Sequence, residues 1–419
     1  MRTVTGKTAA RPPLPAGYGA LLIVLPLLFF VPASLNAQDF GLILNQSAGF
    51  GSNADRDYQA VLVPRFSLLA GDSGDLFVSA SVKAAYENGD WSVVPELLRT
   101  EFSWTAGSSD FRLGRMIFSD PMGIAAVGLF DGVRFSHHTM MGTVGAGLWY
   151  TGLLYKNRAN IAMTYDDATA LNEELNWSRF SATYFASRRL MAALYWDHPS
   201  VAELLGLNIA FISQMDLNGR DTAYHSHYLI AAASLPFQRF IFGLGGAVEM
   251  AQSVNGSESD FQVAFAGDIG VHWMPPAPFH SMLSFTGRFT SGVSERGSRA
   301  AFTPITALSY GEVLQAELPG LSILSLSYTA RLHRTFSAGL TASYFVRSDT
   351  STFTAYPLDG ASSSNQFLGT EFFAHLVWSP VSDLSLNLGA GAFLPSWGDV
   401  APRASSRWRA EMALTLALR

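Results

Sequence analysis

The sequence of 419 residues contains no cysteine and is poor in charge, with 14% Asp, Glu, Lys and Arg. The lack of cysteine excludes disulfides, thiolate catalysis and thiolate metal sites. Soluble domains average roughly 25% charged residues. The formal net charge of −6 gives no electrostatic reason to expect binding to nucleic acid. The chain is instead 48% hydrophobic, with 30 Phe and 37 Gly, yet its mean hydropathy is only +0.18.

Long apolar runs are also missing beyond the N-terminus. No later stretch approaches the ~18 apolar residues of a membrane-spanning helix. The apolar run at 19–33 follows three basic residues, and "SLNAQDF" offers a cleavage point after Ala37. This arrangement predicts an export signal peptide at 1–37 and a mature domain at 38–419. An N-terminal anchor that is retained is the alternative.

What the chain does have is a two-residue rhythm of apolar and polar side chains. In "DFQVAFAGDIGVHWM", Phe261, Phe265 and Ile269 fall on one set of alternate positions, and Asp268 falls on the other. A helix would scatter these side chains around its axis, whereas a strand places each set on one face. Segments with the same rhythm occur at 76–84, 98–104, 284–289, 324–331, 340–347, 384–392 and 408–416.

The connections between these segments alternate in length. Short ones are expected at 70–75, 106–110, 236–239, 275–280, 331–335 and 379–383. Long ones are expected at 252–260, 291–320, 348–365 and 395–406. Tight turns at one end and long loops at the other are typical of an up-and-down antiparallel barrel.

Hydrogen bonding decides between a membrane barrel and a soluble sheet. In hydrocarbon every backbone N–H and C=O must pair internally, so only a closed sheet survives there. The strands are long enough to cross a bilayer, and aromatic residues gather at their ends, as membrane girdles require. The fold class predicted is all-β, a transmembrane antiparallel up-and-down β-barrel of about 18 strands. Counts of 16 and 20 stay open because 155–207 is hard to divide. A soluble sandwich is the alternative.

The export signal, hairpin rhythm and amphipathic strands resemble a bacterial outer-membrane β-barrel protein, and the size resembles a porin. The segment "DFRLGRMIFSDPMGIAAVGLFDGVRFSH" at 110–137 is similar to the strand, inward loop and strand of large substrate-selective porins. The likeness is one of pattern over 38–419. The chain departs from the family at its C-terminus, where Leu418 stands in place of the aromatic residue that barrel-assembly machinery usually reads.

The resemblance implies a porin-like channel in the bacterial outer membrane for passive diffusion of small hydrophilic solutes. Its partners would be outer-membrane lipid, these solutes and the barrel-assembly machinery, with no nucleic acid; a homotrimer is left open. Two alternatives remain: an outer-membrane transporter of hydrophobic compounds, and a surface-exposed adhesin or structural barrel that works through its loops.

A barrel of this size holds water, so charged residues on its inner face would line a pore. The pore-lining residues expected are Arg99, Glu101, Arg112, Asp120, Asp131, Arg134, His225, His227, Asp268, Arg288 and Arg331. The loop at 116–130 is too apolar for open water and is expected to fold into the barrel. Arg112 and Arg134 would form a basic wall there, facing Asp120 and Asp131. An extracellular loop packed on its neighbours is the alternative.

Three other features concern possible metal binding, catalysis and the membrane interface. "HSH" at 225–227 places two imidazoles on one strand face, a spacing that can bind a metal, but the sequence offers no third ligand. No Ser/His or Asp/His constellation has the spacing of a barrel hydrolase. Arg115 falls on the outward phase of its strand, at the membrane interface or at a bulge. We therefore expect no metal, no cofactor and no enzyme activity.

Overall fold

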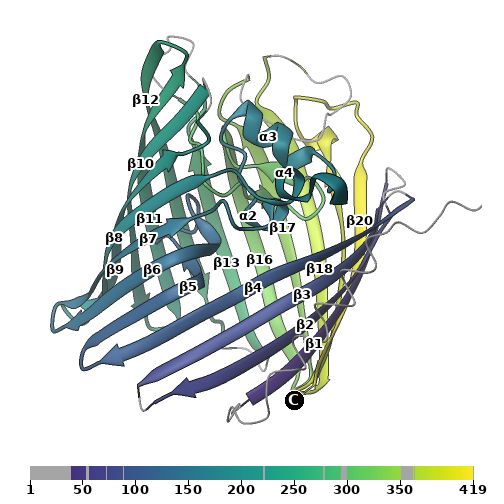
Figure 1. The fold of residues 1–419 in the computed structure, drawn as a ribbon. Coiled ribbons are helices and arrows are strands. Elements are labelled where there is room, and N and C mark those ends of the chain that lie inside the picture. Colours follow the sequence, from purple (N-terminus) through teal and green to yellow (C-terminus); the bar gives the residue numbers. More distant parts are fainter. Residues whose placement is uncertain are drawn as a thin grey trace, which may run out of the picture.

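The computed structural model describes residues 39–52, 56–71, 73–87, 89–219, 222–276, 279–293, 300–350, 362 and 364–418. The predicted signal peptide at 1–37 lies outside these residues. Eighteen strands of the described chain form one closed antiparallel sheet, in which β20 (Arg407–Leu418) pairs with β1 (Asp39–Gly51). Figure 1 shows the resulting barrel. The predicted all-β barrel of 18 strands is confirmed.

The other barrel strands follow one another along the chain, each paired with its neighbours. They are β2 (Arg56–Ala70), β3 (Gly74–Glu87), β4 (Asp90–Ala106), β5 (Ser109–Ser119), β6 (Val127–Thr139), β7 (Gly142–Tyr150), β8 (Arg189–Val201), β9 (Leu205–Asp216), β10 (Thr222–Phe237), β11 (Phe240–Asn255), β12 (Glu258–Trp273), β13 (His280–Thr290), β16 (Leu321–His333), β17 (Phe336–Arg347), β18 (Phe367–Val381) and β19 (Leu384–Leu394).

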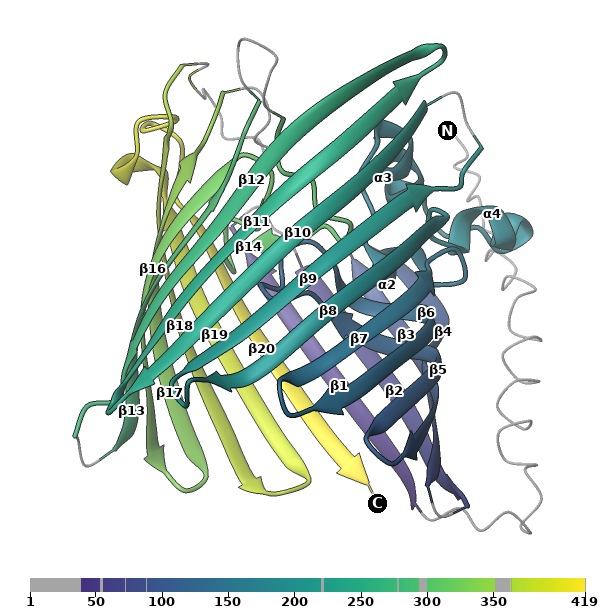
Figure 2. The same ribbon diagram turned by 90° about the vertical axis from the view of Figure 1, so that its left-hand side faces the viewer.

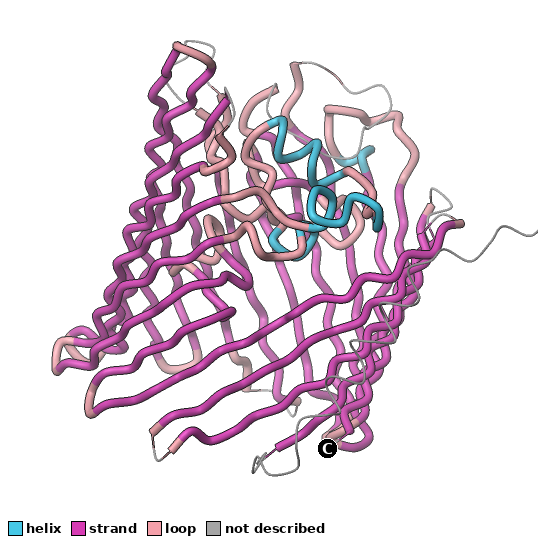
Figure 3. The backbone as a smooth tube through the Cα atoms, viewed as in Figure 1, coloured by secondary structure: helices cyan, strands magenta, loops and turns pink. Residues whose placement is uncertain are grey.

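Helices are short and lie in the connections (Figure 3). They are α2 (Lys156–Ala159), α3 (Tyr165–Asn172), η1 (Trp177–Arg179), α4 (Phe180–Tyr184) and η2 (Pro395–Trp397), and a small hairpin is formed by β14 (Ser309–Tyr310) and β15 (Ala316–Glu317). Among the described residues, no helix has the length and apolar character needed to span a membrane.

Strand β12 shows how the period of two is used. Phe261, Phe265 and Ile269 are exposed on the outer face, whereas Ala264 and Ala266 are buried on the inner face. The outer face therefore presents large apolar side chains, as the alternation predicts. The same division holds for β13, where Phe285 and Phe289 are exposed.

The two rims of the barrel differ. β1 begins and β20 ends at the same rim, where Leu42 pairs with Leu418. All six predicted short connections join consecutive strands at this rim, which we call the turn rim. The described parts of the long connections at 291–320 and 395–406 lie at the opposite, loop rim (Figure 2), whereas most of the connection predicted at 348–365 lies outside the described residues. The long loop expected at 252–260 is wrong. β11 and β12 pair up to Asn255 and Glu258, because polar side chains on both strands continue the ladder to a tight turn at Gly256.

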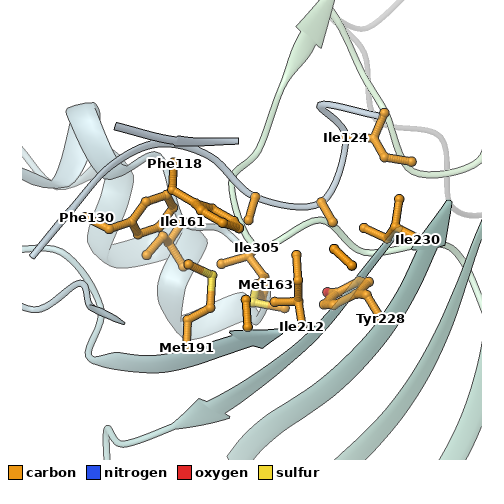
Figure 4. Packing of buried hydrophobic residues seen from close by; sticks show 14 of the residues in the cluster. Phe118, Ile124, Phe130, Ile161, Met163, Met191, Ile212, Tyr228, Ile230 and Ile305 are labelled. Atoms are coloured by element: carbon orange, nitrogen blue, oxygen red, sulfur yellow. The ribbon is translucent and has the colours of Figure 1, made fainter. Parts of the chain in front are cut away.

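Three connections at the loop rim carry the site. Counted from β1, they are the third, L3 (120–126), the fourth, L4 (151–188), and the seventh, L7 (291–320), of which the structure describes 291–293 and 300–320. L4 occupies the region that was hard to divide by sequence, and it holds α2, α3, η1 and α4. Side chains of all three loops bury themselves against the inner face of β8 to β12, in the cluster of Figure 4. Buried members include Ile124, Ile161, Ile305, Ile212 and Tyr228.

Candidate pore lining and inward loops

L3 is folded around one carboxylate. Asp120 is buried and accepts hydrogen bonds from the backbone N–H groups of Met122 (2.9 Å), Ile124 (3.0 Å), Ala125 (2.8 Å) and Ala126 (2.9 Å). A carboxylate that receives several N–H groups holds a turn tightly because each bond is charge-assisted. This apolar segment is buried, as its composition predicts, because Ile124, Ala125 and Ala126 have no exposed surface.

The tip of L3 reaches the opposite side of the barrel. Met122 lies against Gly245 of β11, where an added Cβ would come within 2.9 Å of the Met122 side chain. Arg288 of β13 donates to the carbonyl of Met122 at 3.3 Å. The glycine therefore makes room for a loop that crosses the interior from β5 to β11 and β13.

L7 lies beside L3. The backbone N–H of Ile305 donates to the carbonyl of Ala125 at 2.7 Å, and the N–H of Val127 donates to the Thr306 hydroxyl at 3.4 Å. Further along L7, the Tyr310 hydroxyl accepts a hydrogen bond from Arg288. Burial raises the pKa of Tyr310, so the phenol stays neutral at physiological pH.

L4 covers the part of β4 that has no partner strand on its β5 side. β4 pairs with β5 only from Thr100 to Ala106, so its residues 90–99 have a sheet partner on one side only. The carbonyl of Pro95 accepts from the Tyr184 hydroxyl at 2.7 Å, and Glu96 pairs with Arg158 at 2.9 Å. L4 side chains thus satisfy backbone and carboxyl groups that an adjacent strand would otherwise cover.

Arg115 stands where β4 and β5 separate. It is buried, its guanidinium donates to both carboxyl oxygens of Asp131 at 2.8 Å, and it also donates to the carbonyls of Leu97 and Leu153. The register with β6 runs unbroken through Arg115, so Arg115 marks no bulge in that pairing, whereas the pairing with β4 ends at it. Its burial excludes a position in the exposed interface. One side chain joins β4, β5, β6 and L4.

The predicted basic residues of β4 to β6 come together on the inner face. Arg112 lies directly opposite Arg134 in the register, and Arg99 and Arg112 both pair with Glu101, at 2.6 and 3.2 Å. Arg134 donates to the Tyr195 hydroxyl at 2.7 Å. We call Arg99, Arg112 and Arg134 the arginine row.

The predicted acidic counterpart is placed differently. Asp120 binds the amides of its own loop, and Asp131 pairs with Arg115. Neither carboxylate makes an ion pair with the arginine row among the described contacts. The difference arises because buried backbone N–H groups and a buried guanidinium need these carboxylates more than solvated arginines do.

On the opposite wall, Asp268 and Arg288 form a two-point ion pair, with Arg288 Nε 2.7 Å from Asp268 Oδ1. They border a cavity of about 470 Å³ beneath the tip of L3. Gly243, Gly245 and Gly270 hollow the wall there. The cavity therefore presents an ion pair and the Tyr310 ring beside a wall in which three positions have no side chain.

The expectation for the two histidines of β10 is corrected. Tyr224, Ser226 and Tyr228 turn inward, and Tyr228 and Ser226 are fully buried. His225 and His227 therefore share the outer face with exposed Leu229, and His227 stacks on Phe211. Among the described residues, no group of three potential ligands could hold a metal ion. Arg331 keeps its inward phase but lies at the turn rim, where it donates to the carbonyl of Arg334 at 3.0 Å.

Three residues of the site escaped the sequence analysis. Tyr195 and Tyr310 each accept from an arginine, and Glu249 is buried in the packed interior. The inward phase of "AVEMA" in β11 was a usable signal for Glu249, since a lone acid between apolar residues of a strand needs partners. No pattern in L7 singled out Tyr310.

No protein-family model and no curated protein matches the chain. Solved structures do match: Pseudomonas aeruginosa OprD (12% identity, TM-score 0.59, covering 93% of this chain and 98% of that one), and the outer-membrane protein opdK of the same organism (10%, 0.56, 91% and 99%). A third is P. aeruginosa OccK2 (OpdF) in complex with glucuronate (11%, 0.55, 91% and 98%). The chain has the fold of the OprD/Occ outer-membrane porins.

Proposed function

We propose that this protein is an outer-membrane channel for passive diffusion of small hydrophilic solutes. The observation that carries the proposal is the division of side chains in a closed barrel of 18 strands, apolar outside and with charged residues of β4 to β6, β12 and β13 within. Aromatic clusters support a membrane position: Trp104 stacks on Phe111 near the turn rim, and Trp91 contacts Tyr58 near the loop rim. Such girdles mark the two interfaces of a bilayer.

The pore would be lined by the arginine row and Glu101 on one wall and by Asp268 and Arg288 on the other. L3 and L7 would narrow it between them. Three arginines against Glu101 leave the first wall with a positive excess, because Asp131 and Asp120 are engaged elsewhere. We infer a preference for anionic solutes, small carboxylates among them. A solved structural neighbour that binds glucuronate supports this class.

The same proposal includes an export signal at 1–37 and assembly by the barrel-assembly machinery, with a homotrimer as the alternative to a monomer. Cleavage after Ala37 would be read by N-terminal sequencing of the protein from a bacterial outer membrane. The mass of the detergent-solubilised particle would separate a monomer from a trimer.

Recording from the purified protein in a planar bilayer tests the channel. The expected result is an open, ohmic conductance. In a salt gradient its reversal potential should be displaced toward the equilibrium potential of the anion. A silent bilayer together with uptake of hydrophobic compounds would instead favour a hydrophobic transporter. A silent bilayer together with binding to a host surface would favour an adhesin or structural barrel.

A further inference from the structure

L7 is held by a buried carboxylate at its first attachment to the wall. Glu249 of β11 has no exposed surface. It accepts from the backbone N–H of Thr303 at 2.7 Å and from the Tyr224 hydroxyl at 2.9 Å. The neighbouring Tyr228 hydroxyl donates to the carbonyl of Thr303. Both backbone groups of one loop residue are therefore bound by side chains of the wall.

A second buried carboxylate holds the other end of the loop. Glu371 of β18 is 3% exposed. It accepts from the backbone N–H groups of Glu312 (2.7 Å), Val313 (3.0 Å) and Leu314 (2.8 Å). The turn that presents these groups needs Gly311, whose φ is +82° and whose Cβ would lie 2.9 Å from Glu371 Oε2.

The two attachments are far apart around the barrel. Strands β12, β13, β16 and β17 separate β11 from β18 in the sheet. Between the attachments, L7 contacts L3 through Ile305 and contacts Arg288 through Tyr310. The position of L7 therefore also determines the support of L3 and the orientation of the Arg288 side chain.

Buried carboxylates are costly unless they are hydrogen-bonded, so each glutamate and its amides form a unit that is stable only when docked. Glutamine at position 371 would keep the size but not the chemistry, because both carboxyl oxygens accept from backbone N–H groups of the loop and the NH₂ group would face one of these donors. At position 249 a glutamine NH₂ group could donate to the Tyr224 hydroxyl, so leucine, which has no acceptor, is the change that removes the bond to Thr303.

We propose that Glu249 and Glu371 are positioning residues that together hold L7 across the lumen and thereby fix the width of the pore. This rests on the proposed channel function. The contacts of Glu249 and Glu371 with L7 leave neither carboxylate free for solute. They act through the loop that they bind, and loss of the acceptor oxygens of either glutamate releases that part of L7.

Single-channel recording measures the consequence. Glu371→Gln and Glu249→Leu each shift the main conductance above the wild-type level and move the reversal potential toward zero, because a released L7 no longer narrows the lumen. Glu203→Gln is the matched control, since Glu203 is exposed in a connection at the turn rim. Folded variants with wild-type conductance and wild-type reversal potential would overturn the proposal.

A second readout does not depend on conduction. The chain has no cysteine, so Leu314→Cys introduces a single thiol at a fully buried position of L7. A water-soluble maleimide should modify it slowly when Glu371 is present and faster in the Glu371→Gln background. Equally slow modification in both backgrounds contradicts the proposal. Heat-dependent migration on gels verifies that each barrel is folded.

The two proposals fail separately. If the wild type carries no current but labelling still responds to Glu371→Gln, the channel function is wrong and the anchoring of L7 stands. If the wild type conducts and neither readout responds, the channel stands and the anchoring is wrong. Should Glu371→Gln not fold, Glu249→Leu with Ala301→Cys repeats both measurements at the other attachment, where Ala301 is buried.

Discussion

The inner wall has two unlike regions. On the loop-rim part of β7 to β11 the inward side chains are largely apolar and buried under L3, L4 and L7, as Trp149, Ile212 and Tyr228 show. On the turn-rim part of β4 to β6 the inward side chains are the arginine row, and Arg112 is 45% exposed. The strand geometry is the same in both regions. What differs is the material that covers the inner face, protein in one case and water in the other.

The largest effect is expected in the packed region. Trp149 is 1% exposed and packs on Phe118 with ring centroids 4.5 Å apart. Trp149→Ala should lower the free energy of unfolding by about 3–5 kcal/mol, as aromatic truncations in protein cores do. Urea titration of the protein in lipid vesicles measures it. A loss under 1 kcal/mol would mean that this region is filled by water.

The outer face gives the next largest effect. Leu340 is 53% exposed on the outer face of β17. Leu340→Arg should cost about 2–4 kcal/mol if the position is near the bilayer midplane, because a guanidinium is placed in hydrocarbon. The same titration measures it, with Arg331→Gln as the inner-face partner that should be tolerated. Equal behaviour of the two variants would show that the faces are wrongly assigned.

The arginine row should affect selectivity rather than stability. Arg112→Gln and Arg134→Gln remove positive charge from a solvated wall, so the free energy of unfolding should change by no more than about 0.5 kcal/mol. The reversal potential in a salt gradient should move toward the equilibrium potential of the cation. An unchanged reversal potential in both variants would remove the arginine row from the pore.

The smallest effect is expected for the two histidines of β10. His225→Ala and His227→Ala lie on the outer face, so conductance and reversal potential should equal those of the wild type at neutral and at mildly acidic pH. A change in reversal potential between these pH values that depends on either histidine would return them to the lumen.

The contrast between the two regions also explains which inferences from sequence succeeded. Strand β12 has small or polar residues inward and large apolar ones outward, and its facing was predicted correctly. Strand β10 reverses the pattern, with Tyr228 and Ile230 inward and His225 and His227 outward. The rule that polar residues face the lumen fails there, because L7 and its neighbours replace water as the partner of the inner face.

The inward course of 116–130 followed from its apolar composition, but the use of its acids did not. Asp120 and Asp131 looked like partners for nearby arginines. Both are taken by groups that would otherwise be buried without a partner, the amides of L3 and the guanidinium of Arg115. The partner of each carboxylate is decided by which groups are buried beside it, and the spacing of residues in the sequence does not show which groups are buried.

By itself, the sequence determined the barrel. A period of two, turns of alternating length and a low content of charge suffice, because a closed sheet is the one way to satisfy these strands between oil and water. Only the tertiary structure decided how the interior is divided. Residues far apart in the chain are hydrogen-bonded inside the barrel, as Asn160 is to Ala307 and Val313 is to Glu371. Their pairing depends on where each loop docks, which no local pattern records.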